Sequence, residues 1–129
     1  MATVTIVDET TTGRKNNWTL EFLDETLTLR EFIRRRVYEE VKEFNARQVE
    51  HFRGLVQPTD AEQTLNGYRL KPGRKLDWEA QCAKALEAFE RLGFVVLVDD
   101  RQVDDLDARI ELKTGTEVTF LKLVPLVGG

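Results

Sequence analysis

Apolar and polar residues alternate at the start of the chain, and this alternation predicts a β-hairpin. Val4 and Ile6 flank Thr5 within residues 4–8, which is the two-residue period of a strand with one buried face. A second run, residues 18–23, places three apolar side chains on one side: Trp18, Leu20 and Phe22. The polar segment between the two runs contains a glycine and suits the loop of a hairpin.

The spacing then changes to three and four residues, which predicts an amphipathic helix. Thr28 and Glu31 form the Thr-x-x-Glu pattern of a capping box, in which each side chain binds a free backbone N–H at the helix start. The apolar residues that follow share one face: Leu29, Phe32, Ile33, Val37, Val41 and Phe44. Arg34, Arg35 and Arg36 fall mostly across the other face. We interpret them as solvated charges; the alternative is a docking patch for an acidic partner.

Residues 46–92 carry a weaker pattern, which we interpret as an inserted helical segment with packing of its own. Four apolar residues either continue the first helix or form a short second one before Pro58: Val49, Phe52, Leu55 and Val56. Asn66-Gly67 and Pro72-Gly73 are turn signals.

A further helix is predicted at the end of this segment. Asp77 suits its N-cap and Gly93 its C-terminal end. One apolar stripe runs between them: Trp78, Cys82, Ala85, Leu86, Phe89 and Leu92. Because Cys82 lies inside the stripe, we expect a buried structural thiol rather than a reactive one. Trp78 is expected in the core.

The last third of the chain predicts three strands joined by turns. Residues 94–98 are all apolar, as in a strand buried on both faces. Asp99-Asp100-Arg101 suits a tight turn into a short strand at Gln102-Val103, and residues 104–107 form an acidic bend. A turn at 113–116 leads into an apolar strand at 118–124, in which Val118 and Phe120 share one face and are expected to point into the core. The aspartates lack the spacing of an EF-hand, so no metal site is expected.

Composition and charge exclude several classes of function. With 129 residues, of which 41% are hydrophobic, the chain is expected to form one domain. It has no serine, and His51 and Cys82 are its only histidine and cysteine. A Ser-His-Asp triad and a four-ligand Cys/His zinc site are therefore excluded. The net charge of −4 does not favour nucleic acid or an anionic membrane. A lone cysteine and the absence of a signal-peptide pattern indicate the cytoplasm.

Residues 94–129 resemble the last third of ubiquitin-like proteins and of sulfur carriers of the ThiS and molybdopterin-synthase small-subunit type. In both groups an apolar strand, a tight turn, an acidic stretch and a Thr-Gly-x-x-Val-like turn precede a final strand that ends in Gly-Gly. The hairpin and helix at 4–44 match their N-terminal half. The resemblance implies an α+β fold of the β-grasp type: a mixed sheet packed on a helix in a single domain, 1–129. Residues 46–92 would be a helical insertion and residues 125–129 an exposed tail.

The resemblance also implies a carrier or substrate rather than an enzyme, with no catalytic residue, no metal and no bound cofactor. A ThiF/MoeB-like activating enzyme would adenylate the carboxylate of Gly129 with ATP, and Gly128 would let the tail enter a narrow channel. The activating enzyme would contact the exposed apolar residues before the glycines: Leu121, Leu123, Val124, Pro125, Leu126 and Val127. A conjugating enzyme, a deconjugating protease and a target protein are further possible partners.

Three functions follow from this resemblance. The first is a modifier joined through Gly129 to target amines, which the enlarged recognition surface of the insertion slightly favours. The second is a sulfur carrier with a Gly129 thiocarboxylate, because the Pro-x-x-Gly-Gly ending from Pro125 resembles that group. The third is a binding module on the same scaffold, with an idle tail. We prefer the modifier.

Overall fold

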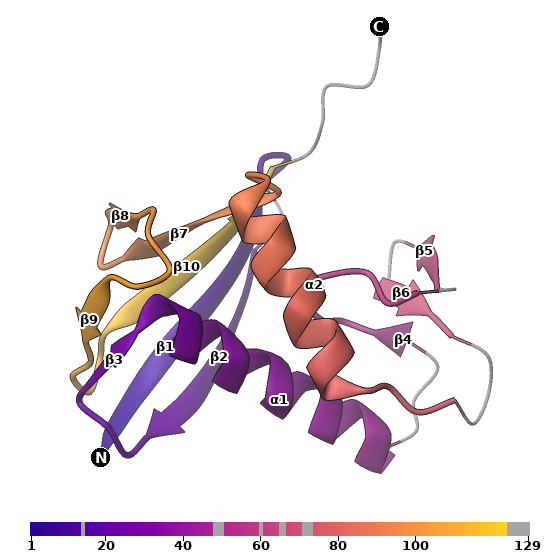
Figure 1. The fold of residues 1–129 in the computed structure, drawn as a ribbon, viewed down its shortest axis with the longest axis horizontal. Helices are drawn as coiled ribbons and strands as arrows, with labels where there is room; N and C mark the ends of the chain where they lie inside the picture. Colours follow the sequence, from indigo (N-terminus) through magenta and orange to yellow (C-terminus); the bar gives the residue numbers. More distant parts are fainter. Residues whose placement is uncertain (14, 48–50, 60, 65–66, 71–73, 124–129) are drawn as a thin grey trace, which may run out of the picture. The chain divides into compact units, whose positions relative to one another are not determined.

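The structure is a computed structural model that describes residues 1–13, 15–47, 51–59, 61–64, 67–70 and 74–123. It is an α+β fold with a mixed five-stranded sheet and two helices (Figure 1). The chain forms two compact units, one of Met1–Phe32 with Ala88–Gly129 and the other of Ile33–Glu87. This division does not test the predicted single domain at 1–129 with an insertion at 46–92, which stays a prediction.

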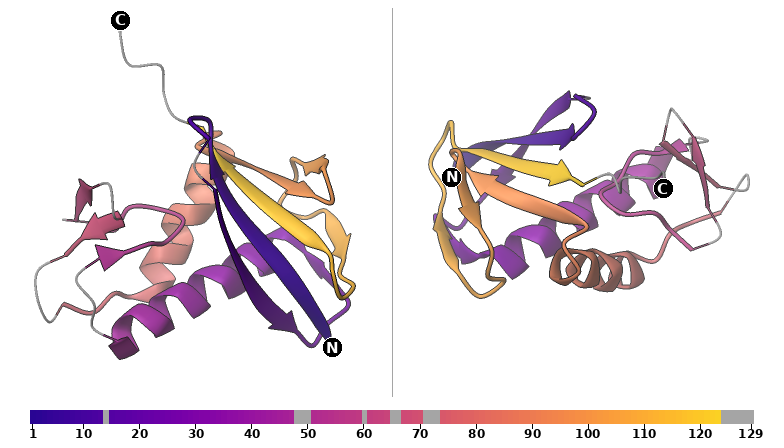
Figure 2. Two further views of the ribbon diagram at one scale, coloured as in Figure 1. Left: turned by 180° about the vertical axis from the view of Figure 1, so that it is seen from behind. Right: turned by 90° about the horizontal axis from the view of Figure 1, so that it is seen from above.

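The first unit contains the five-stranded sheet, whose order is β2-β1-β10-β7-β8. The bounds are Ala2–Thr10 for β1, Lys15–Phe22 for β2, Phe94–Val98 for β7, Arg101–Val103 for β8 and Glu117–Lys122 for β10. Strands β1 and β10 run parallel, and every other neighbouring pair is antiparallel. The last strand is therefore the middle strand, as Figure 2 shows from behind.

The predicted N-terminal hairpin is confirmed. Strands β1 and β2 pair from Ala2 opposite Phe22 to Glu9 opposite Lys15, so both strands are longer than the predicted runs. Near the loop end, Trp18 Nε1 donates a hydrogen bond to Asp8 Oδ2 at 3.2 Å. This bond gives the half-buried indole N–H a partner.

Aromatic rings and branched side chains fill one face of this sheet. Phe32, in the first turn of α1 (Leu29–Arg47), stacks on Phe22 and Phe120 with ring centroids 4.8 and 6.0 Å apart. Phe94 lies 5.9 Å from Phe120 on its other side. Four more side chains are inaccessible to solvent: Val4, Ile6, Val96 and Val118. The prediction that β7 is buried on both faces is wrong, because Val95 and Leu97 are only half-buried.

Two short strands that the sequence pattern did not predict lie beside the start of α1. Strand β3 (Thr26–Thr28) pairs antiparallel with β9 (Arg109–Glu111). The pairing joins segments about eighty residues apart in the sequence, so no local sequence pattern predicts it. It brings the acidic bend at 104–107 to the N-terminus of α1.

The second unit contains a three-stranded antiparallel sheet of order β4-β6-β5. Its strands are β4 (His51–Phe52), β5 (Glu62–Thr64) and β6 (Gly67–Arg69). The predicted helix over Phe52, Leu55 and Val56 is therefore wrong: α1 ends at Arg47 and Phe52 lies in β4. Val49, Asn66, Pro72 and Gly73 lie outside the described residues.

Tertiary contacts explain why this segment is not helical. The ring of Phe52 packs edge-on against Phe44 at 5.4 Å. At Gly54 a Cβ atom would lie 2.1 Å from the Phe52 ring, so the chain can pass there only without a side chain. Leu55 N–H then donates to Glu40 Oε2 at 3.2 Å.

Arg36 is not a solvated charge, which corrects the prediction for the arginine run. Arg36 is 0% exposed, and its Nε donates a hydrogen bond to Oε1 of Glu40, which lies one helical turn later. Glu40 is itself almost buried. Burial of a guanidinium requires such a partner. Arg35 is partly exposed and pairs with Glu39, as a surface charge does.

Helix α2 (Trp78–Glu90) begins as predicted and ends differently. Glu79 N–H donates to Asp77 Oδ1 at 3.1 Å, which confirms the N-cap. At the other end Leu92, not Gly93, adopts the left-handed conformation, with φ of 60°. Trp78 was predicted in the core and is only half-buried, and Leu92, the last residue of the predicted apolar stripe, is 66% exposed. Among the described residues, neither helix combines the length and apolar character needed to span a membrane.

Candidate functional site

Strand β10 is held on both of its edges. Its residues 117–122 pair in parallel with residues 5–10 of β1. On the other edge, residues 118–122 pair antiparallel with β7. A strand paired on both sides has its backbone N–H and C=O groups in ladders and cannot shift register without breaking both. The segment that leads to the predicted site is therefore firmly anchored.

The two faces of β10 have different surroundings. Val118 and Phe120 are 0% exposed, which confirms their predicted place in the core. Leu121 points to the opposite face, where it is half-buried beside its register neighbours Glu9 and Val95. The outward face thus keeps apolar surface next to the strand end.

Leu123, the residue that follows β10, makes a backbone hydrogen bond of its own. Leu123 N–H donates to the carbonyl oxygen of Gly93 at 3.1 Å, while the residue remains 38% exposed. Leu121 and Leu123, two of the predicted contact residues, therefore lie together at the exit of the central strand. The other predicted site residues lie outside the described residues: Val124, Pro125, Leu126, Val127, Gly128 and Gly129.

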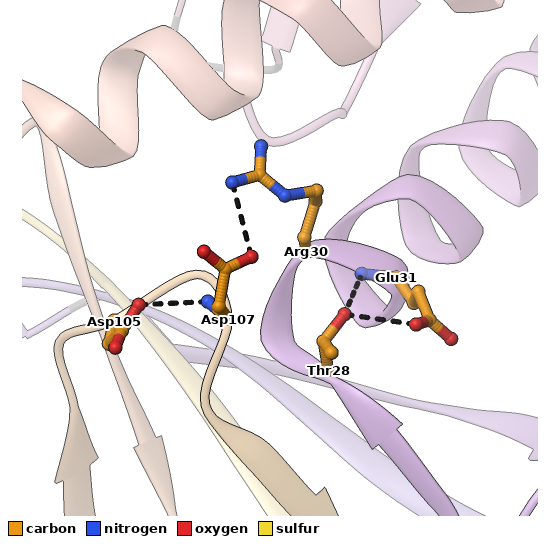
Figure 3. A network of polar contacts seen from close by, with 5 residues as sticks. All are labelled: Thr28, Arg30, Glu31, Asp105 and Asp107. Carbon is orange, nitrogen blue, oxygen red and sulfur yellow. Dashed lines mark hydrogen bonds and ion pairs between the residues drawn. The ribbon is translucent and has the colours of Figure 1, made fainter.

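The acidic bend at 104–107 caps the first helix, a role that the sequence did not reveal. Asp105 Oδ1 accepts a hydrogen bond from Asp107 N–H at 2.9 Å, and Asp107 Oδ1 lies 3.4 Å from Arg30 Nη2 (Figure 3). Arg30 N–H donates to the carbonyl of Leu106 at 2.9 Å. The bend thus accepts a hydrogen bond from a backbone N–H that has no partner within the helix. Its negative charge also interacts favourably with the positive, N-terminal end of the helix dipole.

Half of the predicted capping box completes this helix start, because the Glu31 carboxylate binds the Thr28 hydroxyl rather than a backbone N–H. Thr28 Oγ1 accepts a hydrogen bond from Glu31 N–H at 3.2 Å and donates one to Glu31 Oε1 at the same distance (Figure 3). Leu29 N–H binds the carbonyl of Ala108 at 3.0 Å. Three successive backbone donors of the helix start are therefore paired.

A surface hollow of about 390 Å³ opens beside the bend, and we call it the acidic hollow. Part of its lining is apolar: Phe89, Leu92, Val95, Val103 and Leu106. The remainder carries one cation among four carboxylates and an amide: Arg30, Glu90, Gln102, Asp104, Asp105 and Asp107. All of these residues belong to the first unit. Sequence reasoning missed the hollow because α2, β7 and the bend meet only in the folded chain.

The single cysteine and the single histidine of the sequence lie in the second unit. Cys82 is buried, as predicted, and desolvation raises the pKa of its thiol, an effect that nearby Arg34 partly offsets. A thiol with a raised pKa is mostly protonated at neutral pH and is a poor nucleophile. His51 is half-buried in β4. Within the described ranges, no group of three or more His, Cys, Asp or Glu side chains is placed to hold a metal ion.

Comparison of the chain with protein-family models, with curated proteins and with solved structures found no match. The assignment of a function therefore depends on the residues and their arrangement.

Proposed function

We propose that the protein is a ubiquitin-like modifier of the β-grasp class whose Gly129 carboxylate is activated by adenylation and joined to target amines. The observation that carries the proposal is the position of β10, the middle strand of the sheet, whose last residue lies seven positions before the C-terminal glycine of the sequence. A firmly held strand presents a short following tail at a defined place on the molecule.

The arrangement of the first unit supports the β-grasp assignment. A β-hairpin precedes α1, and Phe32 in the first turn of that helix packs on the sheet. The last strand lies parallel to β1, with the antiparallel strand β7 on its other side. The resemblance in the sequence implies the same order of elements and the same central last strand. Since one scaffold hosts several functions, the tail chemistry needs its own test.

The proposed chemistry is supplied by the partner enzyme. A carboxylate oxygen of Gly129 attacks the α-phosphorus of ATP, and pyrophosphate leaves. A thiolate of the enzyme then attacks the acyl carbon of the adenylate, AMP leaves, and a thioester forms. A target amine displaces that thiolate, loses a proton and forms an amide. The chain contributes an acyl group without a side chain beside it, and the enzyme positions the nucleophiles.

Leu121 and Leu123 are proposed to guide the activating enzyme. They form apolar surface at the exit of β10, one half-buried and one 38% exposed. Exposed apolar residues next to a reacting group are suited to burial by a partner, where a few of them contribute most of the binding energy. In this proposal the activating enzyme also contacts residues 124–127.

ATP–pyrophosphate exchange with a ThiF/MoeB-like activating enzyme from the same source tests this function. The full chain is expected to support exchange, and deletion of Gly128 and Gly129 is expected to abolish it while the far-UV circular dichroism stays unchanged. Leu123→Asp is expected to lower kcat/KM at least tenfold, because it would place a charge in a desolvated contact at a cost of about 1.4 kcal/mol or more.

A matched control is Leu23→Asp. Leu23 is 79% exposed and follows β2, so the same substitution there should leave exchange unchanged. Exchange that survives the diglycine deletion, or equal losses in the two leucine variants, would contradict the proposal.

The sulfur-carrier alternative keeps one observation in its favour, the Pro-x-x-Gly-Gly ending that begins at Pro125. Both functions begin with the same adenylate, so the next step separates them. Intact mass after incubation with the enzyme and ATP should show a reductant-sensitive adduct to an enzyme cysteine for a modifier. Replacement of one oxygen by sulfur, in the presence of a sulfur donor, would instead identify a carrier. Absence of both products would favour the binding module.

A further inference from the structure

We propose that the acidic hollow binds a segment of a partner protein that presents an apolar side chain between lysines or arginines. The inference goes beyond the proposed function, since the described residues that line the hollow include neither Leu121 nor Leu123, the described residues of the proposed enzyme contact. Its occupant is inferred from two properties of the wall, apolar surface at the base and unpaired negative charge at the rim.

The apolar part of the hollow offers contact area to an aliphatic side chain. Leu92 is 66% exposed, which leaves most of its side chain available. Val95 and Val103 are half-buried, whereas Phe89 and Leu106 are buried and form a firm base. A volume of about 390 Å³ accommodates a few side chains and is too small for a folded element. Burial of an aliphatic side chain there favours binding, because it removes apolar surface from water.

The rim of the hollow supplies the charge complementarity. Asp107 is shared with Arg30, and Asp105 is shared with the backbone of the bend. Within the described part of the chain, no hydrogen bond or ion pair engages the exposed carboxylates of Glu90 and Asp104. These two groups are therefore available to cations of a partner.

The charge of the whole first unit acts in the same direction. Its sequence contains fourteen acidic and eight basic side chains, so its field attracts basic segments and repels acidic ones. A purely apolar partner would cover Glu90 and Asp104 without pairing them, which desolvates charge at a cost. A segment that alternates basic and apolar residues meets both requirements of the wall.

The test is a titration of the ¹⁵N-labelled full chain, without any activating enzyme, followed by two-dimensional NMR. The probe is the acetylated, amidated peptide Lys-Leu-Lys-Leu-Lys, with Glu-Leu-Glu-Leu-Glu and Lys-Ser-Lys-Ser-Lys as controls. We expect saturable shifts of the amides of residues 92, 95 and 102–107 with the first peptide only. The affinity should fall as salt is raised, because the rim pairs are exposed.

Three variants separate the charge and apolar contributions. Glu90→Gln and Asp104→Asn should each weaken binding about threefold, the value of an exposed ion pair. Leu92→Asn should also weaken it, and because asparagine tolerates the left-handed backbone the variant stays folded. Asp100→Asn is the matched control: it removes the same charge from an exposed aspartate that does not line the hollow and should leave the affinity unchanged.

The result that overturns the proposal is equally defined. Absence of saturable shifts, shifts that map outside the hollow, or equal binding of the acidic peptide would each exclude a basic-apolar segment as the occupant. Unchanged affinity in the Glu90→Gln, Asp104→Asn double variant would do the same.

Discussion

Arg36 is the largest fully buried side chain of the described chain, and it is charged. Its partner Glu40 also accepts the backbone N–H of Leu55. One carboxylate therefore joins the helix to the loop after β4. The two buried charges are tolerated only together, because a buried charge that loses its partner keeps its desolvation cost.

Glu40→Gln is expected to destabilise the protein strongly. The substitution removes the charge of a buried partner of the guanidinium, a loss that typically costs about 3–5 kcal/mol. Urea unfolding followed by circular dichroism measures the change. Glu43→Gln is the control in the same helix, since Glu43 and Arg47 form an exposed pair worth about 0–1 kcal/mol. Equal stability of the two variants would contradict the assigned role of Glu40.

Alkaline pH is expected to weaken the fold through two residues of the second unit. Desolvation raises the pKa of the Cys82 thiol, and desolvation followed by the charge of Glu40 raises that of Tyr68. Above about pH 9 the unfolded chain releases these protons before the folded chain does, so the free energy of unfolding falls as pH rises. In the Cys82→Ala, Tyr68→Phe variant this decline should be shallower. An identical slope in both proteins would contradict the prediction.

At the scale of elements, the end of α2 shows how a helix can stop without glycine at the turning residue. Gly93 N–H bonds the carbonyl of Ala88 at 2.8 Å, and Leu92 N–H bonds that of Phe89 at 3.1 Å. These are the two bonds of a Schellman motif, whose left-handed position favours glycine. Leu92 occupies that position, so its Cβ atom is held in a strained, left-handed backbone conformation.

Leu92→Gly is therefore expected to raise the free energy of unfolding by about 0.5–1 kcal/mol, since relief of the left-handed strain exceeds the entropy that glycine adds to the unfolded chain. Thermal and urea unfolding measure the gain. Leu92→Ala keeps the Cβ and removes the exposed side chain, so it should give no gain. A glycine variant less stable than the alanine variant would show that the conformation is not strained.

Local patterns were sufficient for some elements and insufficient for others. The hairpin, the capping box at Thr28 and the turn at Asp99 and Asp100, both in the left-handed conformation, depend on residues close in sequence. Strands β4, β5 and β6 have two or three residues each, and their pairing depends on partners outside any local window. The spacing of Phe52, Leu55 and Val56 mimics a helix for that reason.

The sequence contains a pattern that indicates the burial of Arg36, although the run of three arginines obscures it. Arg36 lies four residues after Phe32 and four before Glu40, so all three follow one line along the helix next to the apolar stripe. The run of three arginines suggested a single solvated face. A charged pair at a spacing of four residues beside a stripe is the feature that distinguishes a buried arginine from its neighbours.

At the scale of the whole molecule, the sequence predicted the order of the large elements and the burial of Val118 and Phe120 in the last strand. The centre of the sheet is assembled by the parallel pairing of β1 with β10, which joins the two ends of the chain. The acidic hollow combines Arg30 at the start of α1 with residues between 89 and 107, and it could not be predicted from either segment alone. The predicted tail, residues 125–129, lies outside the described residues, so its role has to be tested chemically.

Trapping with hydroxylamine tests the activation of Gly129 most directly. The full chain is incubated with the activating enzyme, ATP and hydroxylamine, whose nitrogen attacks an activated acyl carbon and displaces AMP or the enzyme thiolate. Tandem mass spectrometry then locates the hydroxamate. The account predicts a hydroxamate on the C-terminal carboxyl of Gly129 that forms only when enzyme and ATP are both present. An unmodified terminus, or a product on an aspartate or glutamate side chain instead, would contradict it.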